Sequence, residues 1–381
     1  MVETSFFYEI LKKYGLSFFS GVPDSLLKDL CAYIQDNSGR HEHVVAANEG
    51  NAVGIATGYY LGTGNPAVVY MQNSGIGNAI NPLLSLADKS VYSIPMLLII
   101  GWRGQPGIKD EPQHLKQGKI TCDLLRSMDM PYIVLSSDKR FFKKQLKDLI
   151  CLMKKENRPV CCVVPKGIFK KYNNKKEIKI SCGLSREEAI EIIISAIGKN
   201  DVIVSTTGKA SREVYELKEK TKVKSKNYFL TVGSMGHASQ IALGLSLAQK
   251  GKRIYCLDGD GALLMHAGGM ATIAEQKPKN LVHILLNNNI HDSVGGQKLA
   301  NTAVDYQKLA KSFGYNEIFL VKTKNELLEC MNMVKKGKGP IFLQICINNF
   351  ARKDLIRPTQ MLSDLKFKFM NFLGTNDAKR I

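Results

Sequence analysis

Polar residues follow two runs of apolar, β-branched residues in the C-terminal half of the sequence. A Gly-Asp-Gly turn around Asp260 comes after residues 253–257, and three asparagines centred on Asn288 follow residues 282–286. If these runs form neighbouring parallel strands, their carboxyl ends meet at one edge of a sheet, where ligands bind in open α/β proteins. Asp260, Asn288 and a nearby backbone carbonyl then supply hard oxygen ligands for Mg²⁺, with positions left for phosphate oxygens and water. The glycines let backbone N–H groups approach phosphate at a helix N-terminus.

The spacing of these two motifs is more informative than either alone, because an isolated Gly-Asp-Gly is usually a plain turn. Between Gly-Asp-Gly and Asn-Asn lie 25 residues, and this pattern resembles the cofactor motif of the thiamine-diphosphate-dependent enzymes. The resemblance implies that Asp260 and Asn288 bind Mg²⁺ together with the carbonyl oxygen of Ile290. Implied contacts of the cofactor around these motifs are Gly259, Asp260, Gly261, Ala262 and Asn288. Asn289 stands where the family pattern has glycine, and asparagine is the next-best residue where φ is positive.

The family also needs a glutamate on a second domain, and Glu49 meets this need. It lies in HVVAANEGNAVGIATGYYLG, after a short apolar run and at the start of a helix rich in small residues. A glutamate there usually only stabilises a helix dipole. With the Asp260 motif present, the resemblance implies that Glu49 is catalytic and hydrogen-bonds the aminopyrimidine ring of the cofactor. An apolar setting favours the neutral carboxyl, which can donate such a bond.

Other cofactor contacts are implied by matching loops. Met235, in TVGSMGHASQIALG, corresponds to the bulky apolar residue that bends the cofactor and presses its 4′-amino group against the thiazolium C2. Gly208 and the pair Gly233-Ser234 correspond to loops on the diphosphate side, and Ser74, in MQNSGIGN, is a further implied contact. A methionine near a helix start is otherwise more often core filler.

The resemblance covers nearly the whole chain, and the linker between its halves is too short for the middle domain of larger family members. The chain is most similar to the phosphonopyruvate decarboxylases, which implies release of CO₂ and phosphonoacetaldehyde in phosphonate biosynthesis. Sulfopyruvate decarboxylase, or another 2-oxoacid decarboxylase, is the alternative, because phosphonate and sulfonate are both tetrahedral anions. Arg103 and Lys109 are the candidate ligands of that anion, although exposed basic residues are often merely solvated.

Several ionisable residues in the matching loops are candidates for catalytic proton transfer. They are Asp24 in VPDS, His114 in DEPQH, and His291 and Asp292 in NIHDS. Each could instead cap a helix or close a turn, and the roles of Asp110 and Glu111 stay open. The resemblance further implies a homodimer or higher homo-oligomer, with the glutamate half of one subunit facing the metal half of another.

Alternation of helical patterns with β-branched runs predicts an α/β fold of two domains, each a parallel sheet flanked by helices. We expect a pyrimidine-binding domain over residues 1–168, a basic linker over 169–184 and a diphosphate-binding domain over 185–381. Ser185 and Glu188 form a capping box at the start of the second domain. Expected helices span 24–35, 49–61 and 77–87. Expected strands span 17–19, 42–45, 67–71, 96–100, 133–135, 160–164, 202–205, 253–257, 282–286, 318–321 and 341–345.

The 381 residues carry a net charge of +19, which raises the alternative of a non-catalytic basic protein that binds nucleotides or nucleic acid. The lysines cluster over 139–155 and 169–179, away from the glycine-rich segments, and G-x-G-x-x-G after the first strand and a P-loop are both missing. We therefore expect a solvated basic surface. A catalytically silent family member is disfavoured because both Glu49 and Asp260 are present.

The cysteines and the hydropathy of the chain bear on its location in the cell. The nine cysteines include no C-x-x-C pair, so we expect reduced thiols, with Cys161 and Cys162 as small core residues. No segment reaches the roughly 20 apolar residues of a membrane span, and the N-terminus has no features of a signal peptide. A cytoplasmic location is expected.

Overall fold

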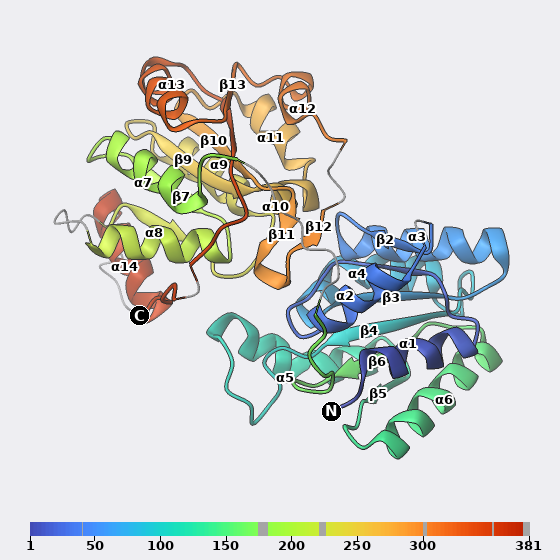
Figure 1. Ribbon diagram of the computed structural model, residues 1–381. Coiled ribbons are helices and arrows are strands. Elements are labelled where there is room, and N and C mark those ends of the chain that lie inside the picture. Colours follow the sequence, from blue (N-terminus) through green and yellow to red (C-terminus); the bar gives the residue numbers. More distant parts are fainter. Residues whose placement is uncertain (40, 174–181, 221–225, 300–302, 353, 376–381) are drawn as a thin grey trace. The chain divides into compact units, whose positions relative to one another are not determined.

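The computed structural model describes residues 1–39, 41–173, 182–220, 226–299, 303–352 and 354–375. It divides into two compact units, Met1–Ile178 with His291–Ala300, and Lys179–Ile290 with Asn301–Ile381 (Figure 1). Each unit contains one six-stranded sheet whose strands pair in parallel. The predicted α/β fold class is confirmed.

The first unit has the strand order β2-β1-β3-β4-β6-β5. One buried cluster joins α1, α2 and α6 to one face of the sheet, and a second joins α3, α4 and α5 to the other. Neighbouring strand residues alternate between them, so Cys161 faces one cluster and Cys162 the other. The strands are β1 (Phe19–Gly21), β2 (His43–Val45), β3 (Ala67–Gln72), β4 (Met96–Gly101), β5 (Tyr132–Val134) and β6 (Val160–Val164). The helices are α1 (Thr4–Lys13), α2 (Lys28–Asn37), α3 (Glu49–Thr63), α4 (Ile76–Pro82), α5 (Pro112–Ser127) and α6 (Lys139–Glu156).

Two predicted helices in this unit need correction. The helix expected from residue 24 begins at Lys28, because Asp24 accepts hydrogen bonds from the N–H groups of Leu26 (3.0 Å) and Leu27 (3.2 Å) and holds them in a turn. The helix expected over 77–87 is α4 followed by a π-helical stretch, Leu83–Ala87. Pro82 has no N–H to continue the α-helical pattern there.

The second unit has the strand order β13-β14-β10-β9-β7-β8. Helices α7, α8 and α13 pack on one face, and α9, α11, α12 and α14 pack on the other. The capping box of Ser185 and Glu188 is confirmed at the start of α7, whereas β8 was not predicted. The strands are β7 (Val202–Ser205), β8 (Tyr228–Leu230), β9 (Ile254–Gly259), β10 (Leu281–Asn287), β13 (Glu317–Val321) and β14 (Ile341–Cys346). The helices are α7 (Arg186–Ala196), α8 (Lys209–Lys220), α9 (Ala238–Ala248), α10 (Asp260–Met265), α11 (Gly269–Gln276), α12 (Tyr306–Phe313), α13 (Lys324–Lys336) and α14 (Leu362–Leu373).

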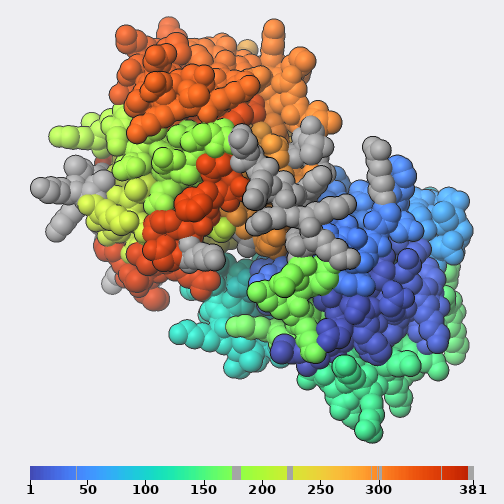
Figure 2. Space-filling view, in the orientation of Figure 1, coloured from blue at the N-terminus to red at the C-terminus, as the bar shows by residue number. Residues whose placement is uncertain are grey.

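The basic surface expected over residues 139–155 is confirmed. Helix α6 buries Phe142, Leu146 and Met153, while its lysines are exposed. Figure 2 shows this segment at the surface of the first unit. Most of the second basic stretch, 169–179, lies outside the described residues. Its first residue, Phe169, is buried in the core of the first unit and forms a parallel bridge with Val2.

The nine cysteines all lie in the described ranges and are free. Cys161 and Cys162 are fully buried in β6, as expected for small core residues. None of the described helices combines the length and the apolar character that a membrane span requires.

Candidate active site

The first unit gathers its candidate residues at the carboxyl edge of its sheet. Asp24 follows β1, Glu49 follows β2, and Ser74 follows β3. These three strands are parallel neighbours, so the residues after them emerge at the same edge. This is the edge at which ligands bind in open α/β sheets.

Glu49 is buried at the start of α3, with 5% of its surface exposed. Asn78 donates a 2.8 Å hydrogen bond to its Oε2, and the backbone of Gly75 packs directly against the carboxyl group. A Cβ on Gly75 would lie 2.3 Å from Oε1 of Glu49, so a larger residue there would displace the Glu49 side chain. Burial raises the pKa of Glu49, as its apolar setting predicted. Burial therefore favours the neutral carboxyl group, which can donate a hydrogen bond, more than exposure to solvent would.

Asp24 is fully buried and forms part of a hydrogen-bonded chain. Gln72 donates to its Oδ1 at 2.6 Å, and Ser74 donates to Oε1 of Gln72 at 2.8 Å. Burial raises the pKa of Asp24, while the bond from Gln72 opposes this shift. The structure thus connects two predicted site residues, Asp24 and Ser74, through one that the sequence did not indicate. Gln72 ends an apolar strand, and only the pairing of β3 with β1 brings it beside Asp24.

Arg103, predicted as an anion ligand, is engaged within the protein. Its Nε donates to Asp110 at 2.8 Å, its Nη2 forms an ion pair with the same carboxylate at 2.5 Å, and its Nη1 donates to Ser25 at 2.9 Å. The guanidinium holds the pKa of Asp110 well below its usual range. The sequence did not indicate a role for Asp110. In the structure its carboxylate holds the guanidinium of Arg103 through these two contacts. Lys109, the other predicted ligand, is exposed.

His114, predicted for proton transfer, lies half-buried in the first turn of α5. Its backbone carbonyl packs against Gly104, where an added Cβ would lie 2.0 Å from the carbonyl oxygen. The close approach and the φ of +69° at Gly104 together require glycine.

In the second unit, β9 and β10 are parallel neighbours, as predicted. Asp260 follows β9 as the first residue of α10, and Asn288 and Asn289 lie in the turn after β10. The N–H of Asn289 donates to Oδ2 of Asp260 at 2.6 Å, and the N–H of Gly261 donates to Oδ1 at 2.8 Å. Asn289 has a φ of +58°, which explains why asparagine can replace glycine there. The prediction that the Gly-Asp-Gly motif and the asparagine motif lie side by side at the carboxyl edge of the sheet is therefore confirmed.

The oxygen donors at this position fit a hard divalent cation. Asp260 and Asn288 are buried. The family resemblance implied the carbonyl oxygen of Ile290 as the third donor. Burial raises the pKa of Asp260 to about 7. A bound cation would return this carboxyl group to its ionised form. A carboxylate, an amide oxygen and a carbonyl oxygen are the donor types that Mg²⁺ takes.

The loops implied to bind diphosphate are adjacent in the second unit. Thr207 Oγ1 donates to the carbonyl of Val232 at 2.9 Å and joins the loop of Gly208 to the loop of Gly233. Gly208 and Ser234 both have positive φ, at 91° and 50°. Such conformations can direct backbone N–H groups into an anion-binding concavity. Met235 is half-buried in the turn before α9.

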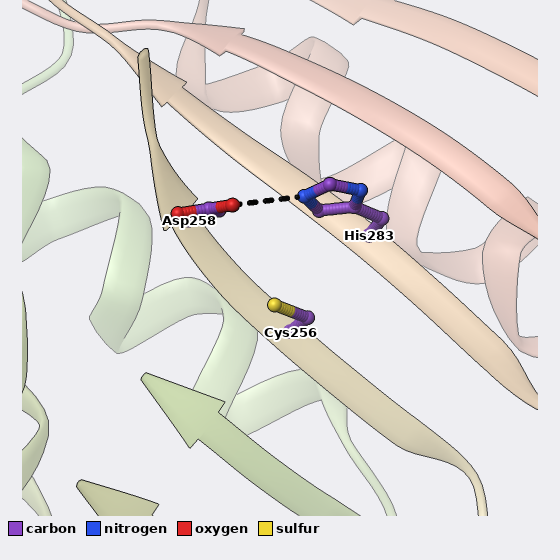
Figure 3. A group of neighbouring side chains, drawn as sticks. All are labelled: Cys256, Asp258 and His283. Carbon is purple, nitrogen blue, oxygen red and sulfur yellow. Dashed lines mark hydrogen bonds and ion pairs between the residues drawn. The ribbon is translucent and has the colours of Figure 1, made fainter. Parts of the chain in front are cut away.

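A buried polar network lies beneath the Asp260 turn, and the sequence analysis did not single it out. His283 Nε2 lies 3.2 Å from Oδ2 of Asp258 (Figure 3). His283 Nδ1 lies 3.0 Å from the Tyr315 hydroxyl. Asp258 also accepts a 2.9 Å hydrogen bond from the N–H of Gly259. The available signal was a histidine within an otherwise apolar strand. The network links β9 to β10, the two strands that carry Asp260 and Asn288.

Cys256 lies next to this network, and donor atoms of Cys256, Asp258 and His283 lie within 4.8 Å of one another (Figure 3). Burial keeps the pKa of the Cys256 thiol well above its usual range. Asp258 and His283 hydrogen-bond each other. The group is a brace between two strands.

His291 and Asp292 lie just beyond the asparagine turn. His291 ends the short strand β11 (Ile290–His291), and Asp292 begins a 3₁₀ turn. Burial lowers the pKa of His291 to about 4, so its imidazole is neutral at physiological pH. Both residues belong to the segment that groups with the first unit.

Comparisons with known proteins agree with this arrangement. Residues 3–124 match the thiamine pyrophosphate enzyme N-terminal TPP binding domain, and residues 206–345 match the corresponding C-terminal TPP binding domain. The chain is 31% identical over 380 residues to a phosphonopyruvate decarboxylase of Streptomyces viridochromogenes, covering 96% of this chain and 93% of that protein. A phosphonopyruvate decarboxylase of Streptomyces hygroscopicus is 31% identical over 388 residues, with 98% and 94% covered.

A sulfopyruvate decarboxylase of Methanosarcina acetivorans is also similar, at 26% identity over 364 residues and with 89% of each chain covered. The similarity to such decarboxylases thus extends over both units. The chain belongs to the thiamine-diphosphate-dependent decarboxylases, carboxy-lyases of the phosphonopyruvate and sulfopyruvate type.

Proposed function

We propose that this enzyme decarboxylates phosphonopyruvate to phosphonoacetaldehyde and CO₂, using thiamine diphosphate and Mg²⁺. The observation that carries the proposal is the 2.6 Å bond between the Asn289 N–H and the buried Asp260 carboxylate, which assembles an oxygen-donor site. Near-full-length identity of 31% to two phosphonopyruvate decarboxylases supports the choice of substrate.

In this proposal, residues 1–168 bind the pyrimidine ring and residues 185–381 bind the diphosphate. The cation is held by Asp260, Asn288 and the carbonyl of Ile290, and the diphosphate lies against the loops of Gly208 and Gly233. Glu49 hydrogen-bonds the aminopyrimidine, and burial supports this role because it raises the pKa of the carboxyl group and shifts it toward the protonated form. Further proposed cofactor contacts are Ser74, Ser234, Met235, Gly259, Gly261 and Ala262.

Thiamine diphosphate, when bound, supplies the nucleophilic carbon and the electron sink that decarboxylation requires. The protein supplies the proton that replaces CO₂ on the substrate carbon. Asp24 is the proposed donor, because burial raises its pKa and so shifts the carboxyl group toward its protonated form. The bond from Gln72 Nε2 to Oδ1 fixes the orientation of the Asp24 carboxyl group. His291 is neutral because its pKa is about 4, so its imidazole does not hold a proton that it could donate.

The proposed assembly is a homodimer or higher homo-oligomer with active sites between subunits. Its support is the division of the site, since Glu49 belongs to the first unit and Asp260 to the second. A cytoplasmic location is also part of the proposal, and the nine free thiols are compatible with a reducing compartment.

The test is a comparison of substrates with the purified full-length protein. We expect CO₂ release from phosphonopyruvate, in the presence of thiamine diphosphate and Mg²⁺, to be much faster than from pyruvate or sulfopyruvate. Faster turnover of sulfopyruvate would transfer the substrate assignment to the sulfonate and leave the decarboxylase chemistry intact. Failure to release CO₂ from any of the three would contradict the proposal.

A further inference from the structure

A pocket of about 90 Å³ lies in the first unit, beside the segment that carries Asp24. Its walls include Leu26 from the segment after β1, Trp102, Arg103, Lys109 and Asp110 from the loop after β4, and Lys166 from the turn after β6. The backbone N–H of Trp102 donates a 2.9 Å hydrogen bond to the carbonyl oxygen of Val164. This bond holds the loop after β4 next to the turn after β6. The volume is ample for a tetrahedral oxyanion, since one water molecule takes roughly 30 Å³ of liquid.

The charge of this pocket favours an anion with two negative charges. Arg103 and Asp110 neutralise each other through a two-point ion pair, with Nη2 and Oδ1 2.5 Å apart. Lys109 and Lys166 contribute two further positive charges. Within the described part of the chain, neither ammonium group has an ion pair or hydrogen bond with a protein group. Both are therefore available to a ligand.

The pocket is directly connected to the proposed proton donor. The N–H of Leu26, a wall residue, donates to Oδ2 of Asp24 at 3.0 Å. Arg103 donates to Ser25 at 2.9 Å, and Ser25 in turn donates to Oδ1 of Asp24 at 3.4 Å. The pocket wall and Asp24 therefore belong to one hydrogen-bonded group of residues.

We infer that Lys166, together with Lys109, binds the phosphonate group of the substrate and determines the preference for a doubly charged anion. This inference rests on the proposed function, and it changes the part that Arg103 plays. The guanidinium of Arg103 is held by Asp110 and Ser25, so Arg103 positions the pocket loop against the Asp24 segment. A phosphonate dianion pairs with both ammonium groups, whereas a sulfonate carries only one charge and a pyruvate methyl group carries none.

Substitution of Lys166 by glutamine tests the inference, because glutamine keeps most of the side-chain length and removes the charge. The kcat/KM ratio of phosphonopyruvate to pyruvate should fall at least tenfold in Lys166→Gln, mainly through a higher KM for phosphonopyruvate. The ratio of phosphonopyruvate to sulfopyruvate should also fall. Lys166→Arg should restore much of both ratios. The matched control is Lys119→Gln, which removes the charge of an exposed lysine on α5. This variant should keep the wild-type kcat/KM ratios.

Two results would overturn the inference. One is an unchanged substrate ratio in Lys166→Gln, and the other is an equal loss on phosphonopyruvate and pyruvate, which would indicate a structural role. Direct binding of methylphosphonate provides a readout that does not depend on turnover. Calorimetry should detect binding that is at least tenfold weaker in Lys166→Gln, and equal binding by the variant and wild type would contradict the inference.

The outcomes separate this inference from the proposed function. If wild type does not decarboxylate phosphonopyruvate, the proposed function fails, while methylphosphonate binding still tests the pocket. A second outcome is that the wild type decarboxylates phosphonopyruvate while Lys166→Gln keeps the wild-type kcat/KM ratios and the wild-type affinity for methylphosphonate. In that case only the assignment of the phosphonate pocket fails. The Tm of each variant is measured as well. A Tm equal to that of the wild type excludes unfolding as the cause of a changed substrate ratio or affinity.

Discussion

The backbone N–H of Asn289 lies 2.6 Å from Oδ2 of Asp260, across the turns that follow two neighbouring parallel strands. The φ of Asn289 is +58°, in the left-handed region that glycine and asparagine tolerate best. This backbone conformation directs the amide of Asn289 at the carboxylate. The geometry of the proposed Mg²⁺ site therefore depends on the backbone of Asn289.

We predict that Asn289→Gly keeps Mg²⁺-dependent binding of thiamine diphosphate, whereas Asn289→Val weakens it. A β-branched residue held in the left-handed region costs on the order of 1–3 kcal/mol. The turn would relax and move its N–H group away from Asp260. Titration calorimetry of both variants in Mg²⁺ measures the difference. If Asn289→Val binds thiamine diphosphate with wild-type affinity, the conformation of residue 289 does not affect the proposed Mg²⁺ site.

Removal of the Asp260 carboxylate should abolish the metal-dependent part of cofactor binding. We expect Asp260→Ala to bind thiamine diphosphate at least about 10–100-fold more weakly in Mg²⁺, the loss seen even for outer partners of metal ligands. Glu329→Ala, at an exposed site on α13, is the control for loss of an acidic residue. Normal binding by Asp260→Ala would refute the metal assignment.

Glu49→Gln should separate cofactor binding from turnover. The variant keeps the side-chain shape and can still accept the hydrogen bond from Asn78, so we expect it to bind thiamine diphosphate. Its kcat should fall roughly 10²–10⁴-fold, the range for loss of a proton-transfer group. Calorimetry and CO₂ release measured on the same preparation test both parts. Near-normal turnover would exclude a catalytic role for Glu49.

The same substitution should also change how stability depends on pH in the cofactor-free protein. Burial raises the pKa of Glu49 above 4.5, so the folded state loses stability as pH rises from 4.5 through the raised pKa. Glutamine removes this cost. The Tm of Glu49→Gln should therefore exceed that of wild type at pH 8, and the difference should vanish as pH falls below 4.5. A lower Tm for the variant at pH 8 would contradict the buried, neutral carboxyl.

The network beneath the Asp260 turn should contribute to stability. His283→Phe keeps a ring in the buried space but leaves Asp258 without its partner from β10. An unsatisfied buried polar group costs about 1–3 kcal/mol, and more when it is charged. We expect a clearly lower Tm, whereas His41→Phe at an exposed position should have little effect. Unchanged unfolding of His283→Phe would mean that Asp258 finds another partner.

Shared active sites predict complementation between inactive chains. Glu49→Gln lacks the first half of the site and Asp260→Ala lacks the second, so mixed dimers should contain one intact site. Mixing the variants under conditions that allow subunit exchange should restore part of the CO₂ release. Absence of rescue, with exchange demonstrated by differently tagged chains, would place both halves of each site in one subunit.

The sequence by itself determined the features that depend on local pattern. The β-branched runs before Asp260 and Asn288 predicted two strands, and parallel pairing then required the turns after them to meet. Glu49 was located because the family resemblance requires a glutamate in the first domain, and a preceding strand and a helix rich in small residues mark its position. These inferences succeed because hydrogen bonding and side-chain periodicity within an element depend on nearby residues.

Only the tertiary structure decided which distant side chains meet. In the first sheet, β4 lies between β3 and β6, while β5 is at the edge. This order places Lys166, after β6, beside the loop that contains Arg103 and Lys109. The pairing of Arg103 with Asp110 and that of Asp258 with His283 are likewise set by loop conformation and strand register. Many strand orders satisfy the same local patterns, and packing of the whole chain selects one.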